Sequence, residues 1–152
     1  MRRHPQLLEG GSHINIDEAA LVRQLVLRSV GWAGPLAARE FVITNSCTEA
    51  LAVCLRAVTS PGDTVAVESP AYYLMLQLLE ILGLKALEIP TDPRTGVSIE
   101  ALDLATREGQ VAACLLVPNA SNPLGSIMPD EHKQRLARLT AERGVAVIED
   151  DI

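Results

Sequence analysis

The sequence predicts an α/β fold, a three-layer arrangement in which helices cover both faces of a mostly parallel sheet. From residue 41 onward, short apolar runs alternate with longer segments of helical periodicity, as in repeated β-α-β units. The run 111–117 is almost wholly apolar, which is typical of a parallel strand buried on both faces. The last run, 145–148, leads directly into three carboxylates, 149–151, which a parallel strand would present at the ligand-binding edge of the sheet.

Five strands are expected, each a short apolar run that is set off by turn or helical segments: 41–44, 64–67, 86–89, 111–117 and 145–148. The third of these has the weakest pattern, and a turn at 92–96 follows it. Because helical segments separate the strands, right-handed crossovers would leave them parallel.

The expected helices cover 17–30, 46–58, 70–82, 98–107 and 129–143. Ser46 and Glu49 are three residues apart, the spacing of a capping box, and Ser98 stands in an N-cap position. Gly83 and Gly144 follow two of the helices, where a left-handed residue commonly ends a helix.

The domain organisation is simple. Residues 1–16, which include Gly10 and Gly11, are expected to form a flexible N-terminal arm, and Asp17 is expected to cap the first helix. Residues 17–152 would then form one domain, because 152 residues suffice for a single core and are too few to assume two.

Charge and hydropathy exclude several classes of partner. The formal net charge is −6 and no cluster of Lys or Arg stands out, which argues against contact with nucleic acid by this segment. No run approaches the roughly 18 apolar residues of a membrane helix, and the N-terminus lacks the pattern of a signal peptide. We therefore expect a cytoplasmic protein with no membrane contact.

Three cysteines are an odd number and lack the spacing of a metal site. Cys54 and Cys114 stand in apolar runs, so we expect both to be core residues. The cysteines therefore give no reason to expect a metal.

The loops at the strand ends are the candidates for function: 45–48, 69–73, 119–125 and 149–151. The first places hydroxyl groups and free backbone N–H groups at a helix N-terminus, which suits a phosphate, although a well-capped helix explains the same residues. No glycine-rich dinucleotide loop or P-loop is present.

The other three loops allow more than one interpretation. Tyr72 and Tyr73 stand out in a chain with only 3% aromatic residues, and they could fill the core or face a ligand. The Asn and Pro residues of 119–125 could serve a stiff turn alone. The terminal carboxylates could bind a metal, pair with a cation or act as caps, and an apolar strand ending in acids also occurs in nucleotide hydrolases.

Four phrases taken together resemble the large domain of the pyridoxal-phosphate-dependent aminotransferases of fold type I (class I/II). The resemblance is closest to the aminotransferase-like domain of MocR-type transcriptional regulators of the GntR family. The phrases are Ile43–Leu51, Pro61–Pro70, Pro118–Asn119 with Asn122–Gly125, and Ile148–Asp151. They stand in the family's order and cover about residues 17–152, so the resemblance implies a partial large domain that is truncated after its fifth strand.

The resemblance also implies the cofactor, pyridoxal 5′-phosphate, and the residues that bind it: Ser46, Cys47, Thr48, Tyr72, Asn122 and Asp150. The first three would hold the phosphate, the tyrosine would stack on the ring, and the asparagine would donate to the phenolic oxygen. The aspartate would pair with the ring nitrogen and so keep the ring an electron sink. By the same resemblance, the bonds before Pro70 and Pro123 are candidates for cis geometry, although trans is commoner in general.

The chain departs from the family in ways that concern catalysis. The family usually has Gly where this chain has Ser46. The Schiff-base lysine lies well beyond Asp150 in the family, whereas this chain has only Lys85, at the start of a strand, and Lys133, expected on a solvated helix face. The partner tyrosine would be residue 153. The substrate-binding arginine and the winged-helix DNA-binding domain are also absent, so we expect no catalytic residue here and a fragment that is inactive alone.

Three hypotheses remain. The leading one is an aminotransferase-like domain that binds pyridoxal phosphate; in the intact protein it would take amino acid and keto acid substrates and form a homodimer. The second is the effector- or cofactor-sensing part of a MocR-type regulator. The third is a standalone α/β domain that binds another phosphate through the loop at Ser46.

Overall fold

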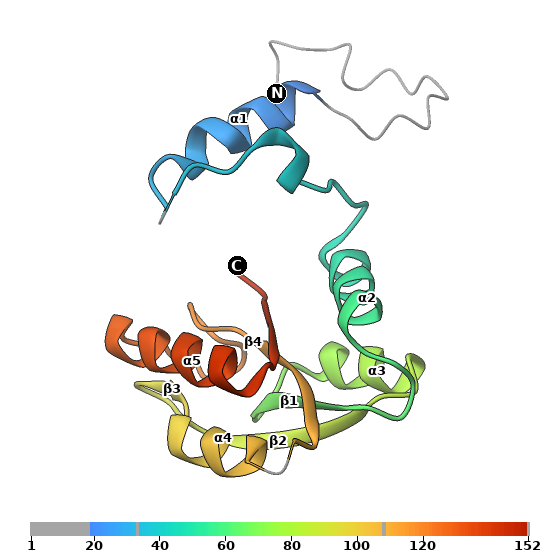
Figure 1. The fold of residues 1–152 in the computed structure, drawn as a ribbon, viewed down its shortest axis with the longest axis vertical. Coiled ribbons are helices and arrows are strands. Elements are labelled where there is room, and N and C mark those ends of the chain that lie inside the picture. Colours follow the sequence, from blue (N-terminus) through green and yellow to red (C-terminus); the bar gives the residue numbers. More distant parts are fainter. Residues whose placement is uncertain (1–18, 33, 108, 152) are drawn as a thin grey trace. The chain divides into compact units, whose positions relative to one another are not determined.

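The computed structural model describes residues 19–32, 34–107 and 109–151 (Figure 1). The chain divides into two compact units, residues 1–46 and residues 47–152. The expected arm at 1–16 and the expected cap at Asp17 lie outside the described residues. None of the described helices is long and apolar enough to span a membrane.

The described residues of the first unit contain the α-helix α1 (Ala19–Ser29) and a short 3-10 helix, η2 (Ala38–Glu40). The buried Ser29 hydroxyl donates to the Val26 carbonyl at 2.8 Å and accepts from the Leu36 amide at 2.9 Å, which ties the connection back to the helix. The predicted strand at 41–44 is wrong, because these residues are not assigned to a strand. A strand needs a neighbour for its backbone groups, and no described strand pairs with this segment.

The second unit is built on a five-stranded sheet in the order β3-β2-β1-β4-β5. Its strands are β1 (Thr64–Ser69), β2 (Lys85–Asp92), β3 (Gly96–Val97), β4 (Val111–Leu116) and β5 (Ala146–Glu149). All neighbours are parallel except β2 and β3, which form a hairpin. The sequence did not predict β3, because two residues are too few to show the pattern of a strand. The Asp92 carboxylate closes the turn between β2 and β3 by accepting from the amides of Arg94 and Thr95.

Four helices of this unit match the predicted ones to within a few residues: α2 (Cys47–Val58), α3 (Tyr73–Ile81), α4 (Ile99–Thr106) and α5 (Asp130–Arg143). The expected cap of α4 is confirmed, because the Ser98 hydroxyl accepts from the Ala101 amide at 3.2 Å. Gly83 and Gly144 both have positive φ, 69° and 67°, as expected for residues that end helices.

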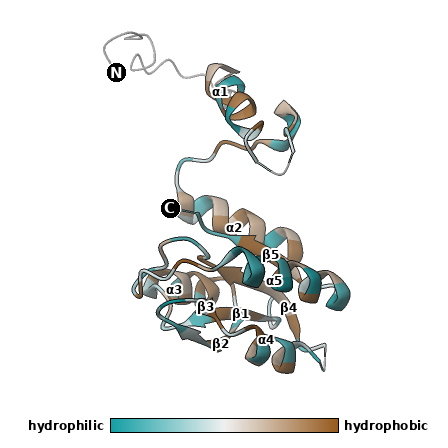
Figure 2. Cartoon of the chain, turned by 90° about the vertical axis from the view of Figure 1, so that its left-hand side faces the viewer, coloured by the Kyte–Doolittle hydropathy of each residue, from teal (hydrophilic) through white to brown (hydrophobic). Residues whose placement is uncertain are grey.

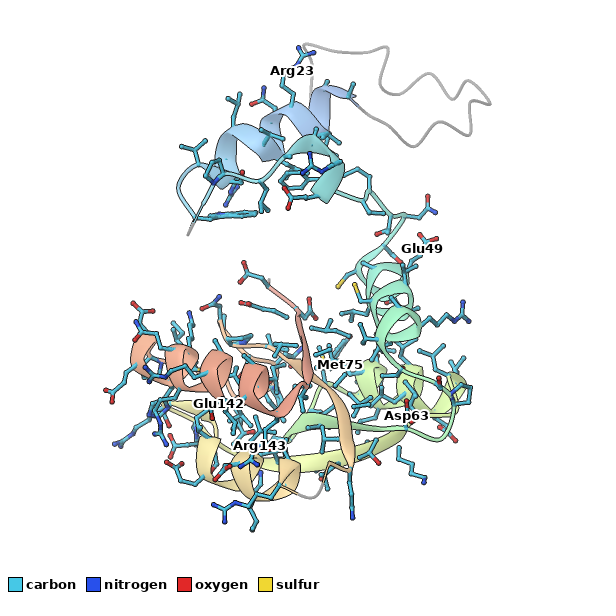
Figure 3. The ribbon with its side chains drawn as sticks, viewed as in Figure 1. Arg23, Glu49, Asp63, Met75, Glu142 and Arg143 are labelled. Atoms are coloured by element: carbon cyan, nitrogen blue, oxygen red, sulfur yellow. The ribbon has the colours of Figure 1, made fainter. Side chains whose placement is uncertain are left out.

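Alternate residues of the strands face two separate cores, one on each side of the sheet. On one side α2 and α3 cover Val65, Val67 and Leu115, and Met75 of α3 lies among them (Figure 3). On the other side α4 and α5 cover a second set of apolar strand residues (Figure 2): Ala66, Ile89, Val111, Cys114 and Leu116. The three-layer α/β/α prediction is therefore confirmed.

One face of α2 does not pack as predicted. Leu51 and Leu55 are buried, but Val53 and Val58 are exposed, and so is Cys54. The prediction that Cys54 is a core residue is wrong, because only the side of α2 toward the sheet is covered in this unit. Cys114 is buried as predicted, and burial raises the pKa of its thiol to about 12.

Replacing Gly144 by alanine is expected to destabilise the second unit by about 1 kcal/mol. Gly144 ends α5 at φ 67°, and nothing lies within 4 Å of an added Cβ, so the cost comes from the backbone alone. Urea denaturation measures it. Gly144→Asn should recover part of the loss, because asparagine tolerates this conformation better. An alanine variant as stable as the parent chain would contradict the prediction.

Candidate cofactor site

The carboxyl ends of the parallel strands form the ligand-binding edge of the second unit. β2 lies on one side of β1, and β4 lies on the other side. The order in which the chain adds strands to the sheet therefore changes direction between β1 and β4. In open α/β sheets the crevice at such a point is where ligands bind. The loops after β1, β4 and β5 all begin at this edge, and they carry the candidate residues Tyr72, Asn122 and Asp150.

The contact between Cys47 and Asp150 joins two parts of the chain that are 103 residues apart in sequence. Cys47 is the first residue of α2, and its thiol donates to Oδ1 of Asp150 at 3.3 Å. The Asp150 amide donates to the Leu116 carbonyl at 2.9 Å, which extends the pairing of β4 and β5 by one residue. The aspartate is therefore held beside the N-terminus of α2.

This contact changes the chemistry of Cys47. Partial burial, followed by the hydrogen bond and the negative charge of Asp150, raises the pKa of the thiol. The thiol therefore stays protonated and acts as a hydrogen-bond donor rather than as a nucleophile. Thr48 is exposed on the same first turn of α2. Ser46 immediately precedes Cys47 and is the last residue of the first unit.

The loop after β4 is closed by its own hydrogen bonds. The Met128 amide donates to the Pro118 carbonyl at 2.8 Å, and the buried hydroxyls of Ser121 and Ser126 lie 2.7 Å apart. Ala120 has a positive φ of 49°, an uncommon value for a residue with a side chain. These contacts hold the loop in one shape, with the Asn122 side chain exposed at the sheet edge.

The two proline bonds singled out by resemblance, Ser69–Pro70 and Asn122–Pro123, are both cis. Tyr72 follows the first of them at the N-cap of α3 and is half-buried against the core on that side. Its ring meets that of Tyr73 edge to face at 4.9 Å, while Tyr73 is 59% exposed. One tyrosine of the pair thus packs inward, and the other faces outward.

The structure corrects the prediction for Lys133. This residue was expected on a solvated face, but it is half-buried on the first turn of α5, and its Nζ donates to Oδ1 of Asn119 at 2.7 Å. The same amide donates from Nδ2 to Oδ1 of Asp151 at 2.9 Å. A helix that follows a strand begins near the carboxyl end of that strand, and this signal could have placed Lys133 at the edge. Lys85 begins β2 and so lies at the opposite edge of the sheet.

Glu68 is a second residue whose importance the sequence did not reveal. It lies in β1 and is only 5% exposed, and its Oε2 accepts from the Val117 amide at 3.1 Å. Within the described residues, Oε1 is buried and has no hydrogen-bond partner. Burial raises the pKa of this carboxyl, although the bond from Val117 acts in the opposite direction. Glu68 anchors the start of the loop that carries Asn119 and Asn122.

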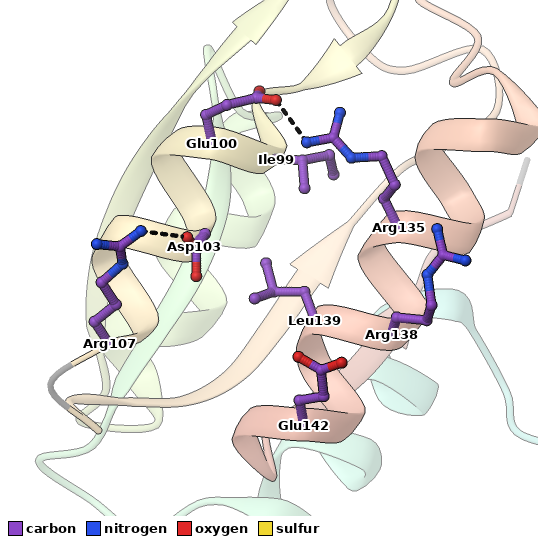
Figure 4. A pocket seen from close by; sticks show the side chains of 8 residues that line it. All are labelled: Ile99, Glu100, Asp103, Arg107, Arg135, Arg138, Leu139 and Glu142. Atoms are coloured by element: carbon purple, nitrogen blue, oxygen red, sulfur yellow. Dashed lines mark hydrogen bonds and ion pairs between the residues drawn. The ribbon is translucent and has the colours of Figure 1, made fainter.

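A pocket of about 490 Å³ lies between α4 and α5, away from the strand ends (Figure 4). Its charges are largely paired: Arg135 with Glu100 at 2.6 Å, and Asp103 with both Arg107 and Arg143 at 2.7 and 3.0 Å. Exposed ion pairs of this kind contribute little to stability. The pocket therefore serves the contact between two helices and lacks the convergent loops of the sheet edge.

The groups at the sheet edge have the chemistry that pyridoxal phosphate requires. The N-terminus of α2 suits a phosphate, and the half-buried carboxylate of Asp150 suits a protonated ring nitrogen. Tyr72 offers an aromatic surface and Asn122 an exposed amide on a stiff loop. The cofactor, when bound, supplies a ring that withdraws electrons from the α-carbon of an amino acid.

Comparison with known proteins agrees with this geometry. Residues 21–152 match the family described as aminotransferase class I and II. The chain is 46% identical over 115 residues to the uncharacterized HTH-type transcriptional regulator YjiR of Escherichia coli (strain K12), covering 76% of this chain and 24% of that protein.

Two solved structures share the fold. An archaeal alanine:glyoxylate aminotransferase has a TM-score of 0.79 at 29% identity, over 86% of this chain and 33% of that one. The α-aminoadipate aminotransferase LysN from Thermus thermophilus, complexed with N-(5′-phosphopyridoxyl)-L-leucine, has a TM-score of 0.75 at 27% identity, over 86% and 32%.

The fold and these likenesses define the second unit as part of a pyridoxal-phosphate-dependent transferase domain of fold type I. The chain belongs to the aminotransferase class I and II family, and it resembles the aminotransferase-like domain of MocR-type regulators. The cofactor of the family is pyridoxal 5′-phosphate, as the ligand of LysN also indicates. The chain spans about a quarter of the length of the curated relatives that it matches.

Proposed function

We propose that this chain binds pyridoxal phosphate non-covalently at the carboxyl edge of its sheet, as the cofactor-holding part of an aminotransferase-like domain. The observation that carries the proposal is the contact between Cys47 and Asp150, which brings the helix N-terminus suited to the phosphate next to the carboxylate suited to the ring nitrogen. Residues 17–152 would be the partial domain. Six residues would contact the cofactor: Ser46, Cys47, Thr48, Tyr72, Asn122 and Asp150.

Within this proposal the chain binds the cofactor without completing the reaction. Lys85 is at the far edge of the sheet, and Lys133 is engaged with Asn119 on the α5 side. In this proposal neither lysine holds the cofactor covalently. The intact protein would act on amino acids and keto acids as a homodimer in the cytoplasm.

A second candidate function is the cofactor-sensing part of a MocR-type regulator. The 46% identity with an HTH-type regulator favours it over a metabolic enzyme, since tyrosine aminotransferase of Homo sapiens is only 30% identical. In that case binding at the sheet edge would serve as a signal. Both candidates require the same cofactor site.

Pyridoxamine 5′-phosphate is the probe of choice, because its amine cannot form an imine with a lysine. We expect calorimetric titration to detect its binding to the chain and Asp150→Asn to weaken it about 10- to 100-fold, the equivalent of one charge-assisted hydrogen bond. Asp63→Asn makes the same chemical change at the opposite edge of the sheet and should leave the affinity unchanged.

Covalent attachment is tested separately. After incubation with pyridoxal phosphate and reduction with borohydride, mass spectrometry should find no specific label on Lys85 or Lys133. Stoichiometric labelling of either lysine, or equal affinity of the Asp150→Asn variant and the parent chain for pyridoxamine phosphate, would contradict the proposal.

A further inference from the structure

The side chains of Lys133, Asn119 and Asp151 form a continuous chain of hydrogen bonds across the sheet edge. It runs from the first turn of α5, through the loop after β4, to the residue after Asp150. The two distances are 2.7 Å from Lys133 Nζ to Asn119 Oδ1 and 2.9 Å from Asn119 Nδ2 to Asp151 Oδ1. No part of the cofactor site proposed above includes these three side chains.

Asparagine is chemically matched to its place between the two charged groups. A lysine ammonium only donates and an aspartate carboxylate only accepts, so the Asn119 oxygen must face Lys133 and the nitrogen must face Asp151. A carboxylate at 119 would repel Asp151, and an apolar side chain would leave both charges without this partner. Donation therefore runs from Lys133 through Asn119 to Asp151, and the Asn119 amide has only one orientation that satisfies both neighbours.

The consequence for Asp150 follows from the geometry of extended backbone. The Asp150 amide continues the pairing of β4 with β5, and neighbouring side chains of such a segment point to opposite faces of the sheet. Asp151 is bound toward α5, on one side. Asp150 is thereby directed to the other side, where the thiol of Cys47 meets it.

We propose that Lys133, Asn119 and Asp151 form a positioning relay that fixes the Asp150 carboxylate at the N-terminus of α2. The proposal rests on the proposed function, in which Asp150 pairs with the cofactor. Lys133 acts through the other two residues and does not contact the cofactor, so it is a positioning residue. Its positive charge also offsets the repulsion among the carboxylates of Glu149, Asp150 and Asp151.

Affinity for pyridoxamine 5′-phosphate provides the first test, with the full chain and four variants. We expect Lys133→Met to weaken binding about five-fold, because Asp150 is no longer held in place, and Lys133→Arg to restore most of the affinity by donating to Asn119. Lys85→Met removes the only other lysine, at the far edge, and should bind as the parent chain does. Asp150→Asn tests the proposed function independently.

The reactivity of Cys47 provides the second readout, one that a general loss of structure would not reproduce. Burial and then the contact with Asp150 raise the pKa of the Cys47 thiol, so loss of that contact in Lys133→Met should lower the pH midpoint of Cys47 alkylation by iodoacetamide. Cleavage after Glu49 separates Cys47 from Cys54, whose midpoint should stay constant. The buried Cys114 should stay unreactive in a variant that remains folded.

The outcomes separate the relay from the site. If Lys133→Met leaves both affinity and the Cys47 midpoint unchanged while Asp150→Asn weakens binding, the relay is wrong and the proposed function stands. If Cys114 becomes reactive in Lys133→Met, the lysine stabilises the fold generally, and the positioning role is contradicted. If Asp150→Asn binds normally, the proposed function fails, and the relay fails with it.

Discussion

Replacing Leu115 by alanine is expected to lower the free energy of unfolding by about 2–5 kcal/mol, the usual cost of a cavity in a close-packed core. Leu115 is 1% exposed and lies in β4, where it is paired with Val67 of β1 on one side and Ile148 of β5 on the other. Its side chain enters the core beneath α2 and α3. Since domains of this size are stable by only about 5–15 kcal/mol, the loss is a large fraction of the total.

Urea denaturation followed by circular dichroism measures this loss. Leu104→Ala removes the same atoms from α4, where the side chain is 68% exposed, and should change the free energy of unfolding by less than about 0.5 kcal/mol. Equal losses for the two variants would mean that the described core is not the one that stabilises the chain. The Leu115→Ala variant should lose affinity for pyridoxamine phosphate only in proportion to the fraction of molecules that are unfolded.

The second large effect concerns the buried carboxyl of Glu68 and its dependence on pH. Because burial raises the pKa of Glu68 in the folded chain, the folded state binds its proton more tightly than the unfolded state does. Glu68 therefore makes its full favourable contribution to the free energy of unfolding below the pKa of an unfolded glutamate, about 4.3. That contribution is lost as the pH rises through the folded pKa, so stability falls over that interval.

Glu68→Gln isolates this effect, because the amide oxygen can still accept from Val117 and the side chain no longer ionises. We expect the stability of the parent chain relative to this variant to decline as the pH rises from about 4 and then to level off. Asp92, Glu100 and Asp103 have lowered pKa values and act in the opposite direction, but they are common to both proteins and cancel.

Two further variants complete the test of Glu68. Glu68→Leu cannot accept from Val117 and should cost about 1–3 kcal/mol for the unpaired buried amide. Glu88→Gln makes the same chemical change at an exposed glutamate on the neighbouring strand and leaves the bond from the Val117 amide to Glu68 in place. A parent chain whose stability relative to Glu68→Gln rises between about pH 4 and 8 would show that Glu68 is ionised and stabilised in the folded state.

Glu68 and Lys133 support the two sides of the same edge. Glu68 holds the Val117 amide at the start of the loop after β4, and Lys133 holds Asn119 two residues further on. The first is a buried group within the sheet, and the second is a half-buried group on a helix. The same loop carries Asn122. The position of Asn122 therefore depends on contacts from the sheet and from a helix that covers it.

Several features followed from the sequence alone because they depend on local chemistry. The alternation of apolar runs and helical segments predicted four of the five strands and all four helices of the second unit. The capping serine at 98 and the glycine at 144 predicted where helices begin and end. The motif phrases resembled those of a known family, and that resemblance implied the family and its cofactor.

Other features were decided by tertiary structure, because they depend on which segments meet. The run 41–44 has the composition of a strand, but no described strand pairs with it, and a strand cannot satisfy its backbone groups alone. Cys54 belongs to an apolar run, yet only one side of α2 is covered, so its side chain is exposed. Lys133 stands among charged residues in the sequence, and only the folding of α5 onto the sheet brings it to Asn119. Local sequence patterns thus determined the elements, and the resemblance of the motif phrases indicated the class of site. Pairing between distant residues determined the contacts within it.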